Sequence, residues 1–419
     1  MVPTRCRPAL AIAAMLTLNV SVWAAALWQF GAPWPARNVA AEFLSTSALI
    51  IASANLMLST RARPFESTFG GLDKMFTSHR LNGLAVALIV VSHFLLVPKV
   101  TPFGPSGWLG FTAITLILVS VLIAIAPRSP WKRLVPLRYQ DWKLTHRTMG
   151  VLISIAVTHS LVAHPFSAAL PMVRWWVYGV ATLGLMAYVF RETIESALLR
   201  RHRYRVGEPR PVATGVLEIP LEPTDRAIDH VAGQFAFVSF EGAPSREQHP
   251  FTISSPPAGG HLRFSVKASG DYTDALQTQL AAGSPARLEG PYGRFDYRTS
   301  GPRQLWVAGG IGITPFLAFL PTLDETRDVR LVWTVRSPED AMYREEIECA
   351  AATLPSLSVT IHSSATVGRL HMADLDIGDP KRLEVLICGP VPMRRAYVDE
   401  LRVLGVPRDR IHYEEFSLR

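Results

Sequence analysis

The chain has 419 residues, which is enough for two or three domains. Hydrophobic residues make up 49% and charged residues 18%, which excludes both a single soluble domain and a protein built only of membrane helices. Much of the net charge of +8 lies at the ends of apolar segments, so it indicates positive-inside membrane topology and no nucleic-acid partner.

Six apolar segments of about 20 residues precede residue 190, and each is long enough to cross the roughly 30 Å hydrocarbon core. We expect the first to be a retained anchor because its apolar run is long; the alternative is a secretory signal. With basic loops inside, we expect a multi-pass protein of the cell (inner) membrane whose soluble half is cytoplasmic. The expected spans are residues 8–28, 40–60, 75–97, 107–126, 143–163 and 171–190.

Two of these spans each contain two histidines, His79 with His93 and His146 with His159. Ionisable side chains inside membrane helices are costly and usually functional. Separations of 14 and 13 residues correspond to about 21 Å and 20 Å of helix, so the pairs match in depth. We infer two haems, with His79 and His146 binding the inner iron and His93 and His159 the outer. The alternative is that some of these histidines only form hydrogen bonds between helices.

The rotation of the histidines about their helices agrees less well than their depth. Fourteen residues return to within about 40° of the same face, but thirteen leave His159 about 140° from His146 on an ideal helix. We therefore expect the fifth span to be overwound, kinked or tilted. His164 would lie about 27 Å from His146, too far to match His93, and we expect it at the outer surface.

The pattern changes after the last span. Residues 191–210 are expected to form an exit helix and a linker, and alternating segments at 212–221, 233–240 and 261–268 predict a small antiparallel β-barrel. From about residue 303, strands alternate with helices, which predicts a parallel α/β nucleotide-binding domain. The expected domains are 1–200, an all-α transmembrane bundle of six helices; 201–300, the barrel; and 301–419, the α/β domain.

A glycine-rich segment, VAGGIGITPF at 307–316, follows a buried-type strand and opens a helix. Its glycines allow the backbone to approach a phosphate, its threonine is a candidate N-cap, and its proline suits the first helical turn. The segment is not the GxGxxG fingerprint, so the glycines alone do not establish the usual dinucleotide fold. The residues concerned are Gly309, Gly310, Gly312, Thr314 and Pro315.

Taken in order, the motifs are H-x13-H, H-x12-H, HPFT, GDYT, GPYG, GGIGITP, CGP and a terminal aromatic residue. With this set, the soluble half resembles the ferredoxin–NADP reductase superfamily. From about residue 40 onward, the whole chain resembles the ferric reductase and NADPH oxidase superfamily of transmembrane electron-transfer flavocytochromes. The resemblance implies an oxidoreductase with FAD, a nicotinamide nucleotide and two b-type haems.

The resemblance also assigns residues to these cofactors. For FAD it implies His249, Pro250, Phe251 and Thr252, with Lys267, Gly270 and Thr273 at the pyrophosphate and Phe416 covering the flavin. For the nicotinamide nucleotide it implies Gly290, Gly293 and the GGIGITP residues, with Cys388, Gly389 and Pro390 beside the reacting ring.

The family chooses between NADPH and NADH after the second strand of the α/β domain. Arg336 and Ser337 stand there, and a guanidinium with a hydroxyl suits a 2′-phosphate. We favour NADPH over NADH; the alternative is a solvated loop pair.

Flavin connects a two-electron donor to one-electron acceptors, so no catalytic acid, base or nucleophile is required. We expect the outer acceptor to be a ferric chelate. Superoxide-forming members of the family carry a further histidine about one turn beyond the outer ligand, where this chain has Val97. Oxygen, a quinone or a partner protein are the alternatives, and a non-redox transporter-like bundle would leave both histidine pairs unexplained.

The expected partners are the lipid bilayer and a small-molecule acceptor, and a homo-oligomer is compatible with the sequence. Four residues are candidates to draw an anionic chelate to the outer face, or are merely scattered surface charges: Arg37, Lys99, His164 and Arg174.

Overall fold

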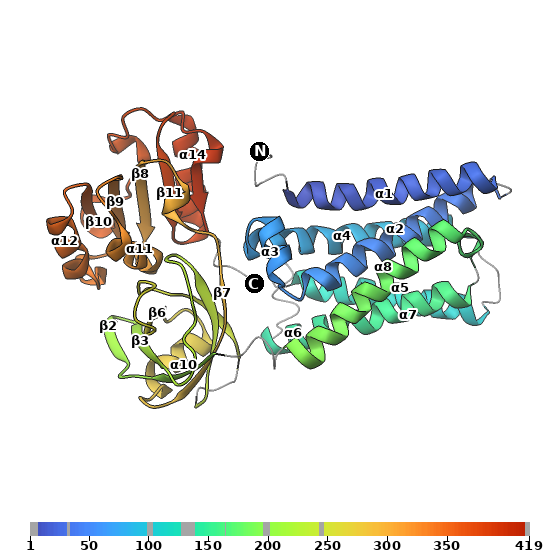
Figure 1. Ribbon diagram of the computed structural model, residues 1–419, viewed down its shortest axis with the longest axis horizontal. Coiled ribbons are helices and arrows are strands. Elements are labelled where there is room, and N and C mark those ends of the chain that lie inside the picture. Colours follow the sequence, from blue (N-terminus) through green and yellow to red (C-terminus); the bar gives the residue numbers. More distant parts are fainter. Residues whose placement is uncertain are drawn as a thin grey trace. The chain divides into compact units, whose positions relative to one another are not determined.

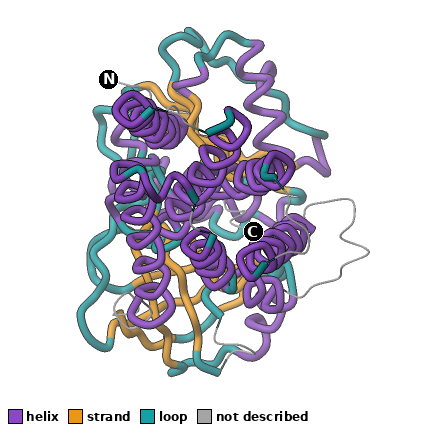
Figure 2. The backbone as a smooth tube through the Cα atoms, turned by 90° about the vertical axis from the view of Figure 1, so that its right-hand side faces the viewer, coloured by secondary structure: helices purple, strands orange, loops and turns teal. Residues whose placement is uncertain are grey.

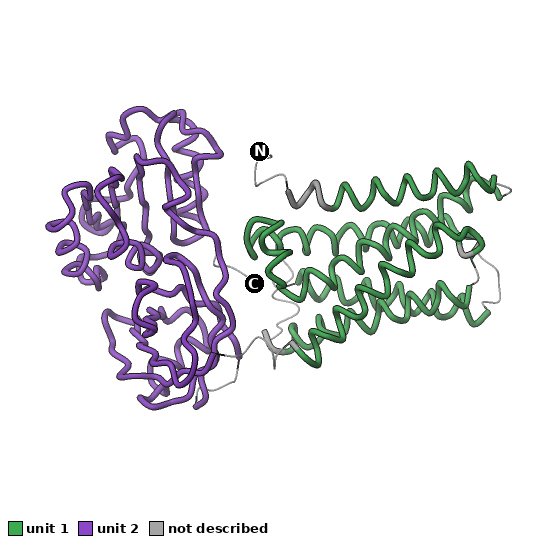
Figure 3. Tube along the Cα trace, in the orientation of Figure 1, with its two compact units in different colours: residues 1–196 green, residues 197–419 purple. Residues whose placement is uncertain are grey.

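The computed structural model describes residues 7–31, 34–98, 104–126, 139–163, 165–195, 202–242 and 247–414. The chain divides into two compact units, Met1–Ser196 and Ala197–Arg419 (Figure 3). The first is helical and the second contains both sheets.

The first unit is a bundle of helices that run side by side (Figure 1), seen nearly end-on in Figure 2. Among the described residues, five helices are long and apolar enough to cross a membrane: α1, α2, α4, α5 and α8. The bounds are α1 Arg7–Phe30, α2 Ala36–Leu58, α3 Arg63–Phe69, α4 Leu72–Leu96, α5 Pro105–Ile125, α6 Tyr139–Arg147, α7 Met149–Val162 and α8 Pro171–Phe190, with short turns at Phe166–Ala169 and Arg191–Glu195.

Helix α2 lies at the centre of the bundle. In its most apolar stretch 61% of the residues are buried, compared with 11% in α4 and 17% in α5. Polar side chains join it to its neighbours. Asn19 donates to the Ser47 hydroxyl at 2.9 Å, and the Trp23 indole donates to the Thr46 hydroxyl at 3.1 Å. Hydrogen bonds between helices are an expected source of association where lipid supplies little hydrophobic drive.

The predicted span 143–163 is not one helix, so the prediction of six single spans is not confirmed. Helix α6 ends at Arg147 and α7 begins at Met149, with Thr148 between them at φ −69° and ψ −9°. The Tyr188 hydroxyl donates to the Arg147 carbonyl at 3.0 Å, which satisfies a backbone acceptor at the break. The 140° offset of a continuous helix therefore does not apply between His146 and His159.

The predicted antiparallel sheet is confirmed, and it begins the second unit. Its strands run in the order β2-β3-β1-β7-β4-β5, and β6 pairs with β3. An isolated bridge between Ile253 and Phe264 joins the end of β5 to β6, while a closed barrel stays a prediction. The bounds are β1 His202–Val206, β2 Arg210–Ala213, β3 Val216–Pro223, β4 Phe235–Phe240, β5 His249–Thr252, β6 Leu262–Lys267 and β7 Pro285–Tyr292, with helix α10 at Asp271–Gln279.

Two expectations for this sheet are wrong. The expected linker 191–210 contains β1, whose Tyr204 and Val206 alternate into the core with 1% and 2% exposure. The expected strand 212–221 is instead the hairpin of β2 and β3, because Gly215 takes a left-handed φ of +68° that turns the chain.

The predicted parallel sheet is also confirmed. Its order is β10-β9-β8-β11-β12, and all neighbours are parallel. The order reverses between β8 and β11, the position where such sheets bind ligands at the carboxyl ends of their strands. The bounds are β8 Arg303–Gly309, β9 Asp328–Val335, β10 Leu357–Ser363, β11 Glu384–Cys388 and β12 Ile411–Tyr413, with α11 Thr314–Phe319, α12 Arg344–Thr353, α13 Ser364–Val367 and α14 Val391–Val403.

Candidate functional site

The two predicted inner histidines lie together in the helical unit. The rings of His79 on α4 and His146 on α6 have centroids 5.8 Å apart and planes at 75°. Among the described residues, neither buried Nδ1 has a hydrogen-bond partner. An iron bound by two imidazole nitrogens at about 2 Å each places the ring centres about 6 Å apart. The pair therefore fits a bis-histidine iron site.

Neighbouring helices hold this pair in place. Asn55 on α2 donates to the His79 carbonyl at 3.0 Å, and Asn82 donates to the Asn55 side-chain oxygen at 2.9 Å. Trp142 stacks parallel on His146, with centroids 5.5 Å apart and planes at 3°. The sequence did not single out these three residues. Trp142 does lie one helical turn before His146, the spacing at which side chains on a helix meet.

The two predicted outer histidines share one hydrogen-bonding arrangement. Nδ1 of His93 lies 2.8 Å from the Ala41 carbonyl, and Nδ1 of His159 lies 2.8 Å from the Ser106 carbonyl. A carbonyl only accepts, so Nδ1 carries the proton and Nε2 is left as a metal ligand, the usual arrangement of metal-binding histidines. A Cβ at Gly110 would lie 2.7 Å from Cε1 of His159, so glycine makes room for this ring.

In the second unit, two predicted flavin motifs meet through one ring stack. His249 of HPFT, on β5, lies on Tyr272 of GDYT, on α10, with centroids 3.8 Å apart and planes at 16°. His249 Nε2 also lies 3.1 Å from a Glu247 carboxylate oxygen. Burial raises the pKa of Tyr272 to about 12, so the phenol stays neutral at physiological pH.

The start of α10 is less suited to a pyrophosphate than its sequence indicates. Gly270 has an extended backbone, and the Thr273 hydroxyl accepts from Ser269 N and donates to the Gly270 carbonyl, both at 2.9 Å. Asp271 and Asp274 occupy the first turn, where their charges oppose a phosphate. The pyrophosphate role of Gly270 and Thr273 stays a prediction.

At the carboxyl edge of the parallel sheet, the GGIG and CGP motifs lie side by side because β8 and β11 are neighbours. A Cβ at Gly312 would overlap the Cys388 carbonyl, and one at Gly389 would lie 3.2 Å from Cα of Gly309. Close backbone approach therefore requires these glycines. Burial raises the pKa of the Cys388 thiol, so the sulfur stays protonated.

The glycine motif forms a 3₁₀ turn, Gly310–Ile313, before α11 begins. Pro315 lies in the first turn of α11, as expected. Thr314 is already helical and its hydroxyl donates to the Ile311 carbonyl at 3.1 Å, so the expectation that it is an N-cap acceptor is wrong. The 3₁₀ turn supplies the helix entry that the cap was expected to provide.

The GPYG motif lies at the end of β7, next to β4 in the antiparallel sheet. Gly293 has a left-handed φ of +101°, and a Cβ there would lie 3.1 Å from the Phe235 ring. The Tyr292 hydroxyl donates to Glu289 at 2.9 Å. These contacts serve local packing, and the nucleotide role of Gly290 and Gly293 stays a prediction.

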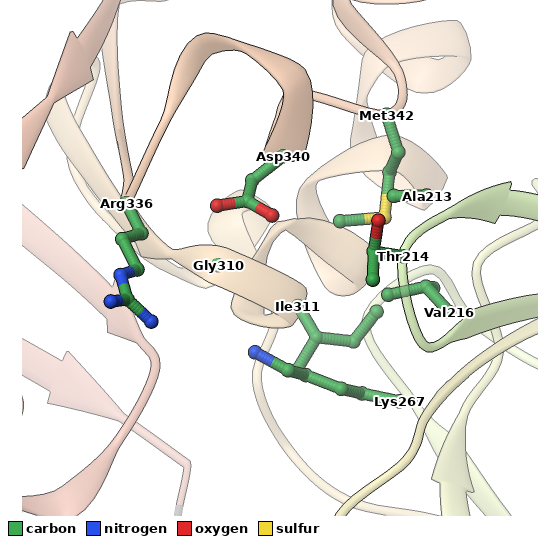
Figure 4. Close-up of a pocket in the computed structure, with 9 residues that line it drawn as sticks. All are labelled: Ala213, Thr214, Val216, Lys267, Gly310, Ile311, Arg336, Asp340 and Met342. Carbon is green, nitrogen blue, oxygen red and sulfur yellow. The ribbon is translucent and has the colours of Figure 1, made fainter. Parts of the chain in front are cut away.

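One pocket brings residues of both sheets together (Figure 4). Lys267, at the end of β6, and Arg336, after β9, line it with Gly310 and Asp340. Asp340 accepts from the backbone N and hydroxyl of Ser337 at 3.1 and 3.2 Å. Lys267, assigned by resemblance to FAD, thus shares a pocket with residues assigned to the nicotinamide nucleotide. The other lining residues are Ala213, Thr214, Val216, Ile311 and Met342.

Two of the residues that the sequence places at the outer face have contacts of their own. Arg37 donates Nε to the Leu96 carbonyl at 2.6 Å, and the Arg174 guanidinium lies 5.3 Å from the centre of the Trp175 ring. Lys99, His164 and Phe416, also named by the sequence analysis, lie outside the described residues.

Comparison with known proteins supports the reading of the second unit. Residues 210–303 match the model of a FAD-binding domain, and residues 306–399 match the model of an oxidoreductase NAD-binding domain. The reductase component of propane 2-monooxygenase from Rhodococcus jostii is 25% identical over 268 residues, which cover 58% of this chain and 71% of that protein. The flavohemoprotein of Rhizobium meliloti is 27% identical over 243 residues, covering 51% of this chain and 60% of that protein, less than two thirds of its length.

Among solved structures, flavohemoglobin from Malassezia yamatoensis, determined with bound FAD and heme, has a TM-score of 0.51 at 20% identity. The match covers 91% of this chain and 96% of that chain, and at this identity it shows likeness of fold alone. The domain matches mark the C-terminal half as ferredoxin–NADP reductase-like, with FAD and NAD(P)H domains. This half is an NAD(P)H-dependent oxidoreductase module.

Proposed function

We propose that the chain is a transmembrane oxidoreductase that passes electrons from cytoplasmic NADPH through FAD and two b-type haems to a ferric chelate on the outer face. The observation that carries the proposal is the proximity of His79 to His146, whose ring centroids lie 5.8 Å apart within a bundle of apolar helices. The same chain contains an NAD(P)H-dependent flavin module, which is a source of electrons for an iron held by such a pair.

When bound, the nicotinamide supplies a hydride, the flavin separates its two electrons, and the haem irons carry them one at a time. The protein's own residues bind and orient. His79 and His146 would hold the inner iron, and His93 and His159 the outer one. The carbonyls of Ala41 and Ser106 keep the outer imidazoles in the tautomer that leaves Nε2 for the metal.

At the other end of the route, we place Lys267 in the nicotinamide nucleotide site. It lines one pocket with Arg336, Gly310 and Asp340, so two cations and one carboxylate lie around the space beside the glycine turn (Figure 4). A site with two cations suits NADPH, which carries a 2′-phosphate, better than NADH, which lacks this group. Replacing Arg336 with Gln should raise KM for NADPH about tenfold, the effect of losing one charge-assisted hydrogen bond, and leave KM for NADH unchanged. Equal changes for both nucleotides would contradict this assignment.

The central experiment measures haem in the purified full-length protein. Anaerobic NADPH and FAD should produce a reduced b-type spectrum from two haems per chain, and a protein that binds no haem would overturn the proposal. Reoxidation by ferric citrate, by oxygen or by a quinone then identifies the acceptor, and faster reoxidation by oxygen or quinone would replace the ferric chelate in the proposal.

A matched pair of variants tests the assignment of the two sites. His93→Leu should remove one haem and abolish external reduction, while NADPH-to-FAD transfer and reduction of the remaining haem continue. His79→Leu should also remove one haem but prevent reduction of the other by NADPH. Wild-type external reduction by His93→Leu would contradict its role as an outer ligand.

A further inference from the structure

The orientation of the Trp142 indole is fixed by two helices. Trp142 lies on α6, and its Nε1 donates to the carbonyl of Ala124 on α5 at 3.2 Å. The ring is parallel to the His146 imidazole, with planes at 3° and centroids 5.5 Å apart. The stack therefore transmits an orientation set by α5 and α6 to the imidazole.

His146 differs from the outer histidines in what fixes its ring. Carbonyl oxygens 2.8 Å from Nδ1 fix the planes of His93 and His159. Within the described part of the chain, Nδ1 of His146 has no hydrogen-bond partner. Rotation about the bond from Cβ to the ring is broad for histidine, so a different contact must select the plane. The parallel indole is that contact.

We propose that Trp142 is a positioning residue that holds the imidazole of His146 nearly perpendicular to that of His79. The inference rests on the proposed ligation of the inner haem by these histidines. Their planes lie at 75° in the structure. In a low-spin ferric haem, perpendicular imidazoles leave two iron d orbitals close in energy, and parallel ones separate them. The largest g value in electron paramagnetic resonance is higher for the perpendicular arrangement, so the plane of His146 can be measured.

The test records the spectrum of the oxidised full-length protein with Trp142 replaced by Leu or Phe. Trp142→Leu has no ring plane, so the largest g value of the inner haem should move toward the parallel-plane value, with two haems still bound. Trp142→Phe keeps a flat ring but loses the bond to Ala124, and its shift should be smaller. The outer haem signal should not move in either variant.

The control is Trp28→Leu on α1, whose side chain is 92% exposed, and it should leave both signals unchanged. An unchanged inner signal in Trp142→Leu, with two haems bound, would overturn the proposal. If Trp142→Leu loses the inner haem, Trp142→Met fills more of the volume without a plane, and a wild-type g value there would overturn it equally. If Trp142→Leu and Trp142→Met lose the inner haem but Trp142→Phe keeps it, the result supports the need for a ring at this position. Loss of the inner haem in Trp142→Phe as well contradicts the proposal. Wild-type protein without haem would instead remove the proposed function itself.

Discussion

The imidazole of His249 lies against the phenol ring of Tyr272 with ring centroids 3.8 Å apart, which ties β5 to the first turn of α10. These residues are 23 positions apart in the sequence, and each belongs to a motif assigned by resemblance to FAD. The stack is therefore the structural link between the two motifs, and losing it should be visible in flavin binding.

We predict that Tyr272→Leu raises the Kd for FAD roughly three- to tenfold, since an aromatic stack contributes about 0.5–1.5 kcal/mol beyond burial. Fluorescence titration of the flavin-free protein with FAD measures this change. Tyr272→Phe keeps the ring and should bind FAD like the wild type. Equal affinity of the Leu variant and the wild type would show that the stack does not orient the site.

The buried imidazole of His230 predicts how stability changes in acid. His230 is 5% exposed, and burial lowers its pKa below the ordinary value of 6.5. Below pH 6.5 the imidazole is protonated in the unfolded chain but stays neutral in the folded chain. The unfolded state therefore binds more protons, and the free energy of unfolding decreases as the pH is lowered.

The measurement is the free energy of unfolding by denaturant, followed by near-ultraviolet circular dichroism from pH 7 downward. His230→Phe cannot take up the proton and should show a shallower loss below pH 6.5 than the wild type. Parallel curves for the two proteins would assign the acid sensitivity to other groups.

An ion pair joins the antiparallel sheet to helix α12 of the second unit. Arg263 on β6 donates Nη1 and Nη2 to the two carboxylate oxygens of Glu346 on α12, both at 2.8 Å, and lies 5.2 Å from the centre of the Tyr343 ring. The two charged side chains are 23% and 37% exposed, so the pair is only partly screened by water.

We predict that Glu346→Gln lowers the free energy of unfolding by about 1–2 kcal/mol, between the values typical of exposed and buried pairs. Glu348→Gln is the matched control, because Glu348 pairs with Arg344 on the same helix and their side chains are 54% and 43% exposed. It should cost no more than about 0.5 kcal/mol. A similar loss in both variants would show that the pair of Arg263 with Glu346 does not hold α12 against the antiparallel sheet.

The sequence predicted those parts of the molecule that depend on local pattern. Apolar length separated the helical half from the sheets, and the rule that parallel strands bind ligands at their carboxyl ends brought Gly309 and Cys388 to one edge. Strand β1 was not predicted, because charged residues at alternate positions, Arg203 and Arg205, are also typical of a basic linker. Only the burial of Tyr204 between them identifies the segment as a strand.

The remaining features depend on tertiary contacts that no local pattern contains. The break at Thr148 is stabilised by Tyr188, which is 40 residues later in the sequence. The presence of Lys267 and Arg336 in the lining of one pocket requires the two sheets of the second unit to pack together. The sequence pattern brought His79 and His146 together, whereas the rotation between His146 and His159 could not be read from an ideal helix, because α6 ends at Arg147 and α7 begins at Met149.

Gly110 on α5 provides a test of the outer site that leaves every proposed ligand in place. An added Cβ would lie 2.7 Å from Cε1 and 3.0 Å from Nε2 of His159, closer than such atoms approach without movement. We predict that Gly110→Ala displaces this ring and lowers outer haem occupancy or shifts its spectrum, since overpacking typically costs about 1–3 kcal/mol. The inner haem should be unaffected. Gly179→Ala on α8 is the matched control, because a Cβ there meets nothing within 4 Å. Haem content and spectra of both variants decide the matter, and an unperturbed outer haem in Gly110→Ala would argue against His159 as its ligand.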